Sequence, residues 1–274
     1  KWLFTSKSKE GQNSRIHILL EIDAFKKIHE AWARLGYPFG SLTPSYATSI
    51  GSSADRPAAL AELVGFLNSG GIKYPTTRIG ELHFADATPY ETVFERKLEP
   101  GVRLLPKELC EVVKKGMVDV VENGTARRAF QAFKLPDGSW IPVGGKTGTG
   151  DHRYESYGKG GKLLESRVVS RSGCFAFVIG DRFHGTITAY VPGAKAAGYA
   201  FTSALPVAIL KVLSPELTPL ITRRYTPEMA AALKAETAAA DSAAAAERKL
   251  KRRAAAAKAV KPAAPAADAP DSEH

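Results

Sequence analysis

The sequence predicts an α+β domain in which helices cover an antiparallel sheet. Two observations lead to this fold class. Three segments with a helical spacing of apolar residues come first, and a group of β-rich segments separated by turn residues follows. The 274 residues are 44% hydrophobic, which is enough to bury a core, and no run approaches the roughly 20 apolar residues that cross a bilayer. We therefore expect a folded domain over most of the chain.

The three expected helices lie at residues 22–35, 57–69 and 106–123. In each segment, apolar side chains recur every three or four positions and so form one face. Start and stop residues set their limits: Gly36 after the first helix, Asp55 as the cap of the second, Gly70 and Gly71 at its end, and Pro106 and Gly124 around the third.

Three β-rich runs follow, at residues 140–149, 174–179 and 186–191. The short connection between the last two predicts a hairpin, and a final helix at about residues 199–213 would cover the sheet. The stretch 151–172 is polar and rich in glycine, which predicts either a mobile loop beside the first strand or a plain solvated connection.

Residues 226–274 consist mainly of Ala with Lys, Arg, Glu and Pro, and they predict a frayed helix followed by a disordered tail. Eight Lys or Arg and seven Asp or Glu lie there, so about +9 of the net charge of +10 belongs to residues 1–225. The basic residues are spread along the chain without interleaved aromatics, so we expect no nucleic-acid partner. Residues 1–225 are expected to form the domain, and nothing specific is expected to bind the tail.

The stretch from Val143 to Gly150, with the sequence VGGKTGTG, carries the chemistry. On a strand, Lys146 and Gly148 would face one side, and Thr147 and Thr149 the other. A substrate with a terminal carboxylate and a reacting carbonyl needs a cation, hydroxyl donors and a backbone N–H aimed at the developing oxyanion. This strand offers all three, and the missing side chain of Gly148 lets a substrate backbone lie close.

These residues resemble the KTG motif of penicillin-binding proteins, whose transpeptidase domain also uses SxxK and SDN-type motifs. The similarity is strongest to the class A proteins of high molecular mass. Three further stretches resemble the same domain: residues 46–51, which read YATSIG; residues 122–128, which read ENGTARR; and the paired strands at 175–191. The resemblance covers most of residues 11–215, and it implies the fold that penicillin-binding proteins share with serine β-lactamases, incomplete at its N-terminus.

The resemblance also implies roles for individual residues. Lys146 would polarise the site and assist proton transfer. Thr147 and Thr149 would bind the carboxylate of a peptide or a penicillin, and the N–H of Thr149 would form half of the oxyanion hole. Gly11-Gln12-Asn13 is similar to the family's Ser-x-Asn motif with Gly11 in place of Ser, so Asn13 would hold the substrate amide without the usual hydroxyl relay. A surface turn is the other interpretation of Asn13.

The nucleophilic serine and the base lysine of SxxK are expected outside this chain. Two literal matches exist, Ser6 to Lys9 and Ser156 to Lys159. The first leaves no room for the helices that should separate it from Asn13, and the second follows KTG in a glycine-rich stretch. We interpret both as coincidental, and we expect the sequence to be the C-terminal portion of a longer protein.

The implied activity is peptidoglycan D,D-transpeptidation at the periplasmic side of the bacterial inner membrane. The implied partners are stem peptides, lipid-linked precursor, β-lactams, a membrane reached through a segment outside this sequence, and proteins of a cell-wall synthesis complex. Two alternatives stay open: a D,D-carboxypeptidase or β-lactamase-type hydrolase, and a non-catalytic scaffold. No cofactor is expected. His29, His83, His152 and His184 show no metal-ligand spacing, so no metal site is expected, and Cys110 and Cys174 are expected to be buried thiols.

Overall fold

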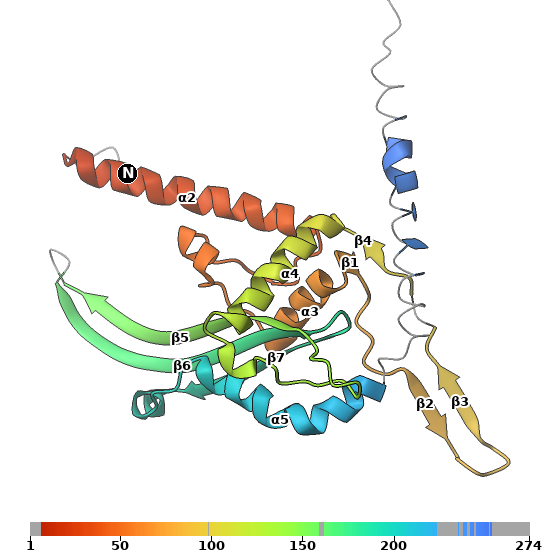
Figure 1. The fold of residues 1–274 in the computed structure, drawn as a ribbon. Coiled ribbons are helices and arrows are strands. Elements are labelled where there is room, and N and C mark those ends of the chain that lie inside the picture. The colour runs from red at the N-terminus through yellow and green to blue at the C-terminus, as the bar shows by residue number, and fades with distance from the viewer. Residues whose placement is uncertain are drawn as a thin grey trace, which may run out of the picture.

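The computed structural model describes residues 7–97, 99–158 and 162–223, and in the tail residues 235, 238, 239, 242, 243, 245–251 and 253. Helices and strands mix as the α+β prediction requires (Figure 1). The helical elements are α2 (Lys9–Arg34), η1 (Tyr46–Ile50), α3 (Pro57–Asn68), α4 (Lys107–Glu122), η2 (Arg127–Ala129), η4 (Ala194–Gly198) and α5 (Ala204–Arg223). The strands are β1 (Ile72–Lys73), β2 (Glu81–Phe84), β3 (Thr92–Glu95), β4 (Val102–Arg103), β5 (Val143–Tyr157), β6 (Leu163–Ile179) and β7 (Phe183–Pro192).

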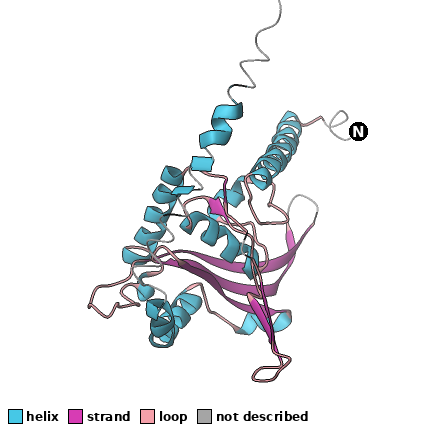
Figure 2. Cartoon of the chain, turned by 90° about the vertical axis from the view of Figure 1, so that its right-hand side faces the viewer, coloured by secondary structure: helices cyan, strands magenta, loops and turns pink. Residues whose placement is uncertain are grey.

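The main sheet is antiparallel, in the order β5-β6-β7. Its registers place Val143 opposite Ile179 and Ile179 opposite Phe183. Helices α3 and α4 lie on one side of the sheet and α5 on the other (Figures 1 and 2). The long strand β6 lies in the middle, so its side chains meet helices on both faces.

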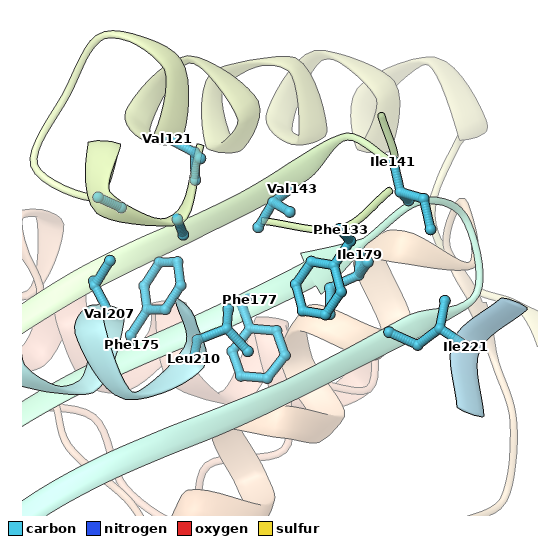
Figure 3. Close-up of a cluster of buried hydrophobic side chains, with 12 residues drawn as sticks. Val121, Phe133, Ile141, Val143, Phe175, Phe177, Ile179, Val207, Leu210 and Ile221 are labelled. Carbon is cyan, nitrogen blue, oxygen red and sulfur yellow. The ribbon is translucent and has the colours of Figure 1, made fainter. Parts of the chain in front are cut away.

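The larger buried cluster fills the space between the sheet, α5 and the segment after α4 (Figure 3). Phe133 and Phe175 are fully buried there, and Val207 and Leu210 reach them from α5. On the opposite face, Met117 of α4 packs with a smaller group from α3 and β6. Each face of the sheet therefore has its own helical cover.

Helix α2 begins 13 residues before the expected start at residue 22. The Ser8 side chain caps it by accepting a hydrogen bond from the N–H of Gly11 at 3.1 Å, and Glu10 is an acid in the first turn, where the helix dipole favours negative charge. The alternative interpretation of Asn13 as part of a surface turn is therefore wrong. Gly36 follows the helix with a positive φ of 85°, as a C-terminal stop residue should.

Asp55 does not cap α3, because Arg56 is the capping residue and its side chain makes no capping hydrogen bond. The Asp55 carboxylate instead accepts hydrogen bonds from the N–H groups of Gly40, at 2.8 Å, and Arg56, at 2.7 Å. It ties the loop after α2 to the start of α3. The predicted limits of the second and third helices are otherwise confirmed to within two residues.

The prediction of a loop or irregular connection at residues 151–172 is wrong. Strand β5 runs on to Tyr157 and β6 begins at Leu163, so the two strands form a long hairpin (Figure 1). Register shifts occur at His152/Arg153 and Ser156/Tyr157. Side-chain pairs across the strands stabilise this ribbon, including the Arg167 guanidinium 4.8 Å from the centre of the Tyr154 ring.

The last helix, α5, begins at Ala204 instead of residue 199 and continues to Arg223. It runs past Pro215 and Pro219, which lie inside the helix. Contrary to the expectation that no segment approaches the length of a membrane span, residues Ala204–Thr222 are long and apolar enough to span a membrane by length and composition alone. In this structure, however, α5 packs Val207 and Leu210 against the sheet. Most of residues 226–274 lie outside the described part of the chain, so the predicted disordered tail lies mainly outside it as well. The few residues of this segment that the structure describes are helical and exposed.

Candidate functional site

The candidate site lies on β5, which is an edge strand of the main sheet in the described part of the chain. Its first half packs tightly because it carries two adjacent glycines. A Cβ at Gly144 would lie 3.1 Å from the backbone N of Val118 on α4, and one at Gly145 would lie 2.3 Å from the ring of Phe175. The glycines let a helix and an aromatic ring approach opposite faces of the strand, which fixes β5 immediately before Lys146.

The backbone of β5 presents alternate residues at its open edge. The N–H of Gly180 donates to the carbonyl of Pro142 at 2.8 Å, and this pair starts an antiparallel ladder in which every second residue bonds to β6. The residues between them, including Thr147 and Thr149, direct their N–H and C=O groups away from β6. The N–H of Thr149 therefore points to the open edge, where an oxyanion donor is expected.

The side chains follow the expected alternation. Gly144 faces α4, so Lys146 and Gly148, two and four residues later, share the side of the sheet that α3 and α4 cover. A Cβ at Gly148 would meet nothing within 4 Å. The surface beside Lys146 is therefore open at Gly148.

Lys146 is exposed, and its Nζ donates to the carbonyl of Thr147 at 2.7 Å. Among the described residues, its ammonium group joins no carboxylate in an ion pair. Since the carbonyl of Thr147 points to the open edge, the ammonium group lies at that edge as well. It can add a carboxylate as a further partner there.

Thr147 and Thr149 are oriented by residues from other elements. The Oγ1 atoms of Thr147 and Thr125 lie 2.7 Å apart, so one hydroxyl donates to the other. Thr149 Oγ1 accepts from the backbone N–H of Ser203 at 3.0 Å, just before α5. Each hydroxyl has one hydrogen and two acceptor lone pairs. The hydrogen of Thr149 and one hydrogen of the threonine pair therefore stay available for an anionic ligand.

Thr125 and Ser203 were not predicted from the sequence to be parts of this site. Thr125 lies in the ENGTARR stretch at residues 122–128, so the family resemblance drew attention to its segment but not to its contact. Ser203 acts through its backbone, 54 residues from its partner in sequence. No local pattern could have revealed that contact.

Asn13 does not contact this strand. It is exposed in the second turn of α2, and no hydrogen bond joins it to Lys146, Thr147 or Thr149 in the described part of the chain. Its predicted role as the amide-binding residue stays a prediction.

The two literal SxxK matches lie in different settings. Ser6 is outside the described residues, while Ser8 is the capping residue of α2. Ser156 is on the β5–β6 ribbon opposite Glu165, and Lys159 is outside the described residues. Ser156 has no hydrogen bond to a lysine side chain among the described residues.

Two thiols and one cluster of a histidine with two acids are the other reactive or ligand groups of the described residues. Burial raises the pKa of both the Cys110 and Cys174 thiols, so neither is a ready nucleophile. His83, Asp86 and Glu91 come together on the exposed β2–β3 hairpin, with ligand atoms within 4.8 Å of one another. No metal site is expected from the sequence. The hairpin brings the three residues together, but they are exposed, and His83 already bonds Glu91 at 2.7 Å.

Comparison with known proteins gives a partial match. No protein-family model matches the sequence. Over 148 residues, the chain is 25% identical to Penicillin-binding protein 1B of Buchnera aphidicola subsp. Acyrthosiphon pisum (strain APS), a match that covers 53% of this chain and 18% of that protein. The chain therefore spans less than a fifth of the length of this relative.

Two solved structures illustrate the similarity of the fold. One is the D,D-transpeptidase domain of a peptidoglycan glycosyltransferase from Eggerthella lenta, with a TM-score of 0.42, 16% identity, and coverage of 74% of this chain and 50% of that chain. Another is Penicillin binding protein 3 from Mycobacterium tuberculosis in complex with aztreonam, with a TM-score of 0.40, 14% identity, and coverage of 62% and 37%. The sequence match to Penicillin-binding protein 1B, together with the resemblance of the β5 strand to the KTG motif, supports the similarity of this chain to a penicillin-binding protein transpeptidase-like domain.

Proposed function

We propose that this chain supplies the substrate-binding strand of a peptidoglycan D,D-transpeptidase, a serine acyl-transferase that penicillins inhibit. The observation that carries the proposal is the open edge of β5, where an ammonium group, oriented hydroxyls and an edge-directed N–H meet within four residues. A peptide that ends in a carboxylate needs this combination of groups.

In the proposed reaction, a serine outside this chain attacks the carbonyl of a D-Ala-D-Ala unit. The N–H of Thr149 stabilises the negative charge that develops on the carbonyl oxygen, and the hydroxyls of Thr147 and Thr149 bind the terminal carboxylate. Lys146 polarises the site and assists proton transfer. The C-terminal D-Ala leaves, and an amine on a neighbouring stem peptide then takes the acyl group. Penicillins bind the same edge and trap the acyl-enzyme.

The proposal includes a location and partners. The enzyme would act on the periplasmic side of the inner membrane of a bacterium, attached through a segment outside this sequence. Its partners would be stem peptides, lipid-linked precursor and proteins of a cell-wall synthesis complex. A hydrolytic version of the same site would release D-Ala without forming a cross-link, so product analysis separates the two chemistries.

A scaffold that binds wall peptide without catalysis is the second candidate. One observation favours it: Asn13, the residue expected to hold the substrate amide, lies exposed on α2 and makes no hydrogen bond to the β5 edge. Such a protein would bind β-lactams weakly and without a covalent bond.

Covalent labelling with a fluorescent penicillin tests these candidates. The natural full-length protein and residues 1–274 would be labelled in parallel, and the modified peptide identified by mass spectrometry. We expect labelling of the full-length protein at a serine outside residues 1–274, and none of the shorter chain. Labelling at Ser6 or Ser156 would overturn our placement of the nucleophile, and no labelling of either protein would favour the scaffold.

A further inference from the structure

The segment between η4 and α5 crosses the sheet next to the candidate site. The N–H of Ser203 in this segment donates to Thr149 Oγ1 at 3.0 Å. One residue earlier, the carbonyl oxygen of Thr202 lies so close that a Cβ at Gly173 would be 2.9 Å from it. Since Gly173 is paired with Thr149 across β5 and β6, the segment packs over this residue pair. The position of the Ser203 N–H therefore depends on how the segment is held to the sheet.

An arginine on β6 holds the same segment by its backbone. Arg171 Nη1 donates to the carbonyl of Phe201 at 3.3 Å. Arg171 lies two residues from Gly173 along the strand, so both face the same side of the sheet. The carbonyl before Thr202 and the N–H after it are thus bound on that one side, the first by Arg171 and the second by Thr149.

A carboxylate holds the Arg171 guanidinium in turn. Asp151 lies opposite Arg171 in the register of β5 and β6, and its Oδ2 is 3.7 Å from Arg171 Nη2. The same oxygen lies 3.6 Å from Arg153 Nη1. Arg171 is the more enclosed of the two arginines, with a side chain that is 19% exposed against 41% for Arg153. Its planar guanidinium can bind a carboxylate and a backbone carbonyl at once.

These contacts make Arg171 a weak contributor to stability. Its Nε is buried and makes no hydrogen bond among the described residues, and a buried donor without an acceptor opposes folding. Asp151 is 39% exposed, so water weakens its attraction for Arg171. The clear consequence of this arginine is instead the fixed position of residues 201–203.

We propose that Arg171 is a positioning residue for the Thr149 hydroxyl. By holding the Phe201 carbonyl, it keeps the Ser203 N–H on Thr149 Oγ1. Because this hydrogen bond occupies a lone pair of the hydroxyl, the hydroxyl hydrogen points away from Ser203 and binds an anionic ligand. Arg171 acts through these residues and touches no ligand itself. The inference rests on the proposed function, in which Thr149 binds the carboxylate of a peptide or a penicillin.

A double-mutant cycle in the full-length protein tests this role. Acylation by a fluorescent penicillin at several concentrations separates the dissociation constant of the non-covalent complex from the maximal acylation rate. Arg171→Met should raise that dissociation constant about 3–10-fold and change the maximal rate less. Arg171→Lys keeps a cationic donor and should restore part of the affinity. In a Thr149→Val background, Arg171→Met should have no further effect, because the hydroxyl that it positions is gone.

Arg153→Met is the matched control. It removes the other cation beside Asp151, and Arg153 makes no hydrogen bond to Phe201 among the described residues. This variant should leave the dissociation constant unchanged. Equal effects of Arg171→Met with and without the Thr149 hydroxyl would overturn the inference. If Thr149→Val alone binds penicillin as tightly as wild type, the carboxylate-binding role of Thr149 in the proposed function fails instead.

Hydrogen exchange of the Ser203 amide in residues 1–274 tests the positioning step without any activity. Arg171→Met should speed this exchange at least about fivefold, because the segment is less firmly held on Thr149. Arg153→Met should leave the exchange rate unchanged. An unchanged rate in folded Arg171→Met would exclude Arg171 as the residue that holds the segment, whatever the labelling of the full-length protein gives.

Discussion

The threonine hydroxyls on β5 depend on residues from outside the strand. Thr125, between α4 and η2, lies 2.7 Å from Thr147, and the N–H of Ser203 bonds Thr149. These contacts limit the directions in which each hydroxyl can donate to a ligand. Orientation of the binding hydroxyls is therefore shared between three parts of the chain.

We predict that Thr125→Val lowers the second-order rate constant for penicillin acylation of the full-length protein by about 2–10-fold, because a neutral hydrogen bond contributes about 0.5–1.5 kcal/mol. Thr125→Ser keeps a hydroxyl and should restore most of the rate. Stopped-flow measurement of labelling gives both values. If valine and serine variants react equally fast, Thr125 does not position Thr147.

Asp55 carries the second prediction for a single residue. Hydrogen bonds from the N–H groups of Gly40 and Arg56 lower the pKa of its carboxyl group below the usual value. The folded state therefore holds its proton less tightly than the unfolded state, and the carboxylate adds stability above the unfolded pKa of about 3.9. That contribution disappears as the pH falls through the folded-state pKa.

Urea denaturation of wild type and Asp55→Asn at pH 6 and pH 3 measures this contribution. The variant should be less stable than wild type at pH 6, and the difference should shrink at pH 3. Asp86→Asn changes a carboxylate that is 81% exposed and serves as the control. A difference that is the same at both pH values would show that ionisation of Asp55 does not matter for stability.

At the scale of elements, the packing of β5 against α4 depends on which residues surround each glycine of the strand. Gly144 and Gly148 lie on the same side of one strand, but a Cβ would meet the α4 backbone at the first position and open space at the second. One glycine is thus required by packing, and the other leaves room beside Lys146.

Gly144→Ala should lower the free energy of unfolding by about 1–3 kcal/mol, since an added methyl group must displace α4. Gly148→Ala should change it by less than about 0.5 kcal/mol yet slow penicillin labelling, because its methyl group occupies the open side of the strand. Thermal or urea denaturation gives the stabilities, and the labelling assay gives the rates. Equal stability losses in the two variants would contradict this account of β5.

At the scale of the whole molecule, the core joins segments that are distant in sequence. The larger cluster combines Val121, Phe133 and Phe175 with Leu210 of α5, so the last helix completes a core that begins near the end of α4 (Figure 3). By contrast, α2 has no buried residue, and the side chains of β2 and β3 are all exposed. Among the described residues, most of the free energy of folding should therefore come from the sheet and the helices that pack on it.

Leu210→Ala should destabilise the protein by about 2–5 kcal/mol, because it opens a cavity in this cluster. Val212→Ala on the same helix should cost less than about 0.5 kcal/mol, as Val212 is 76% exposed. Denaturation curves of residues 1–274 would compare the two variants. Similar losses would mean that α5 is not held to the sheet through its Leu210 side.

The sequence by itself determined the fold class, the positions of α3, α4 and the three long strands, and the alternation of side chains around Lys146. These features depend on spacing along a single segment, which the pattern of apolar, turn and glycine residues records directly. It did not give the start of α2 or the ribbon at residues 151–172. Polar and glycine residues there read as turn and loop signals, while helix capping and cross-strand pairing, respectively, favoured regular structure.

Only the tertiary structure decided which groups surround the KTG strand. The contacts of Thr147 with Thr125 and of Thr149 with Ser203 span 22 and 54 residues, and the hydrogen bond from Arg171 to Phe201 joins β6 to the segment before α5. Such contacts depend on how elements pack in three dimensions, and local sequence patterns carry no information about the distance between them. The sequence therefore predicts which strand carries the site, and packing determines the direction in which the hydroxyls and backbone groups of that strand point.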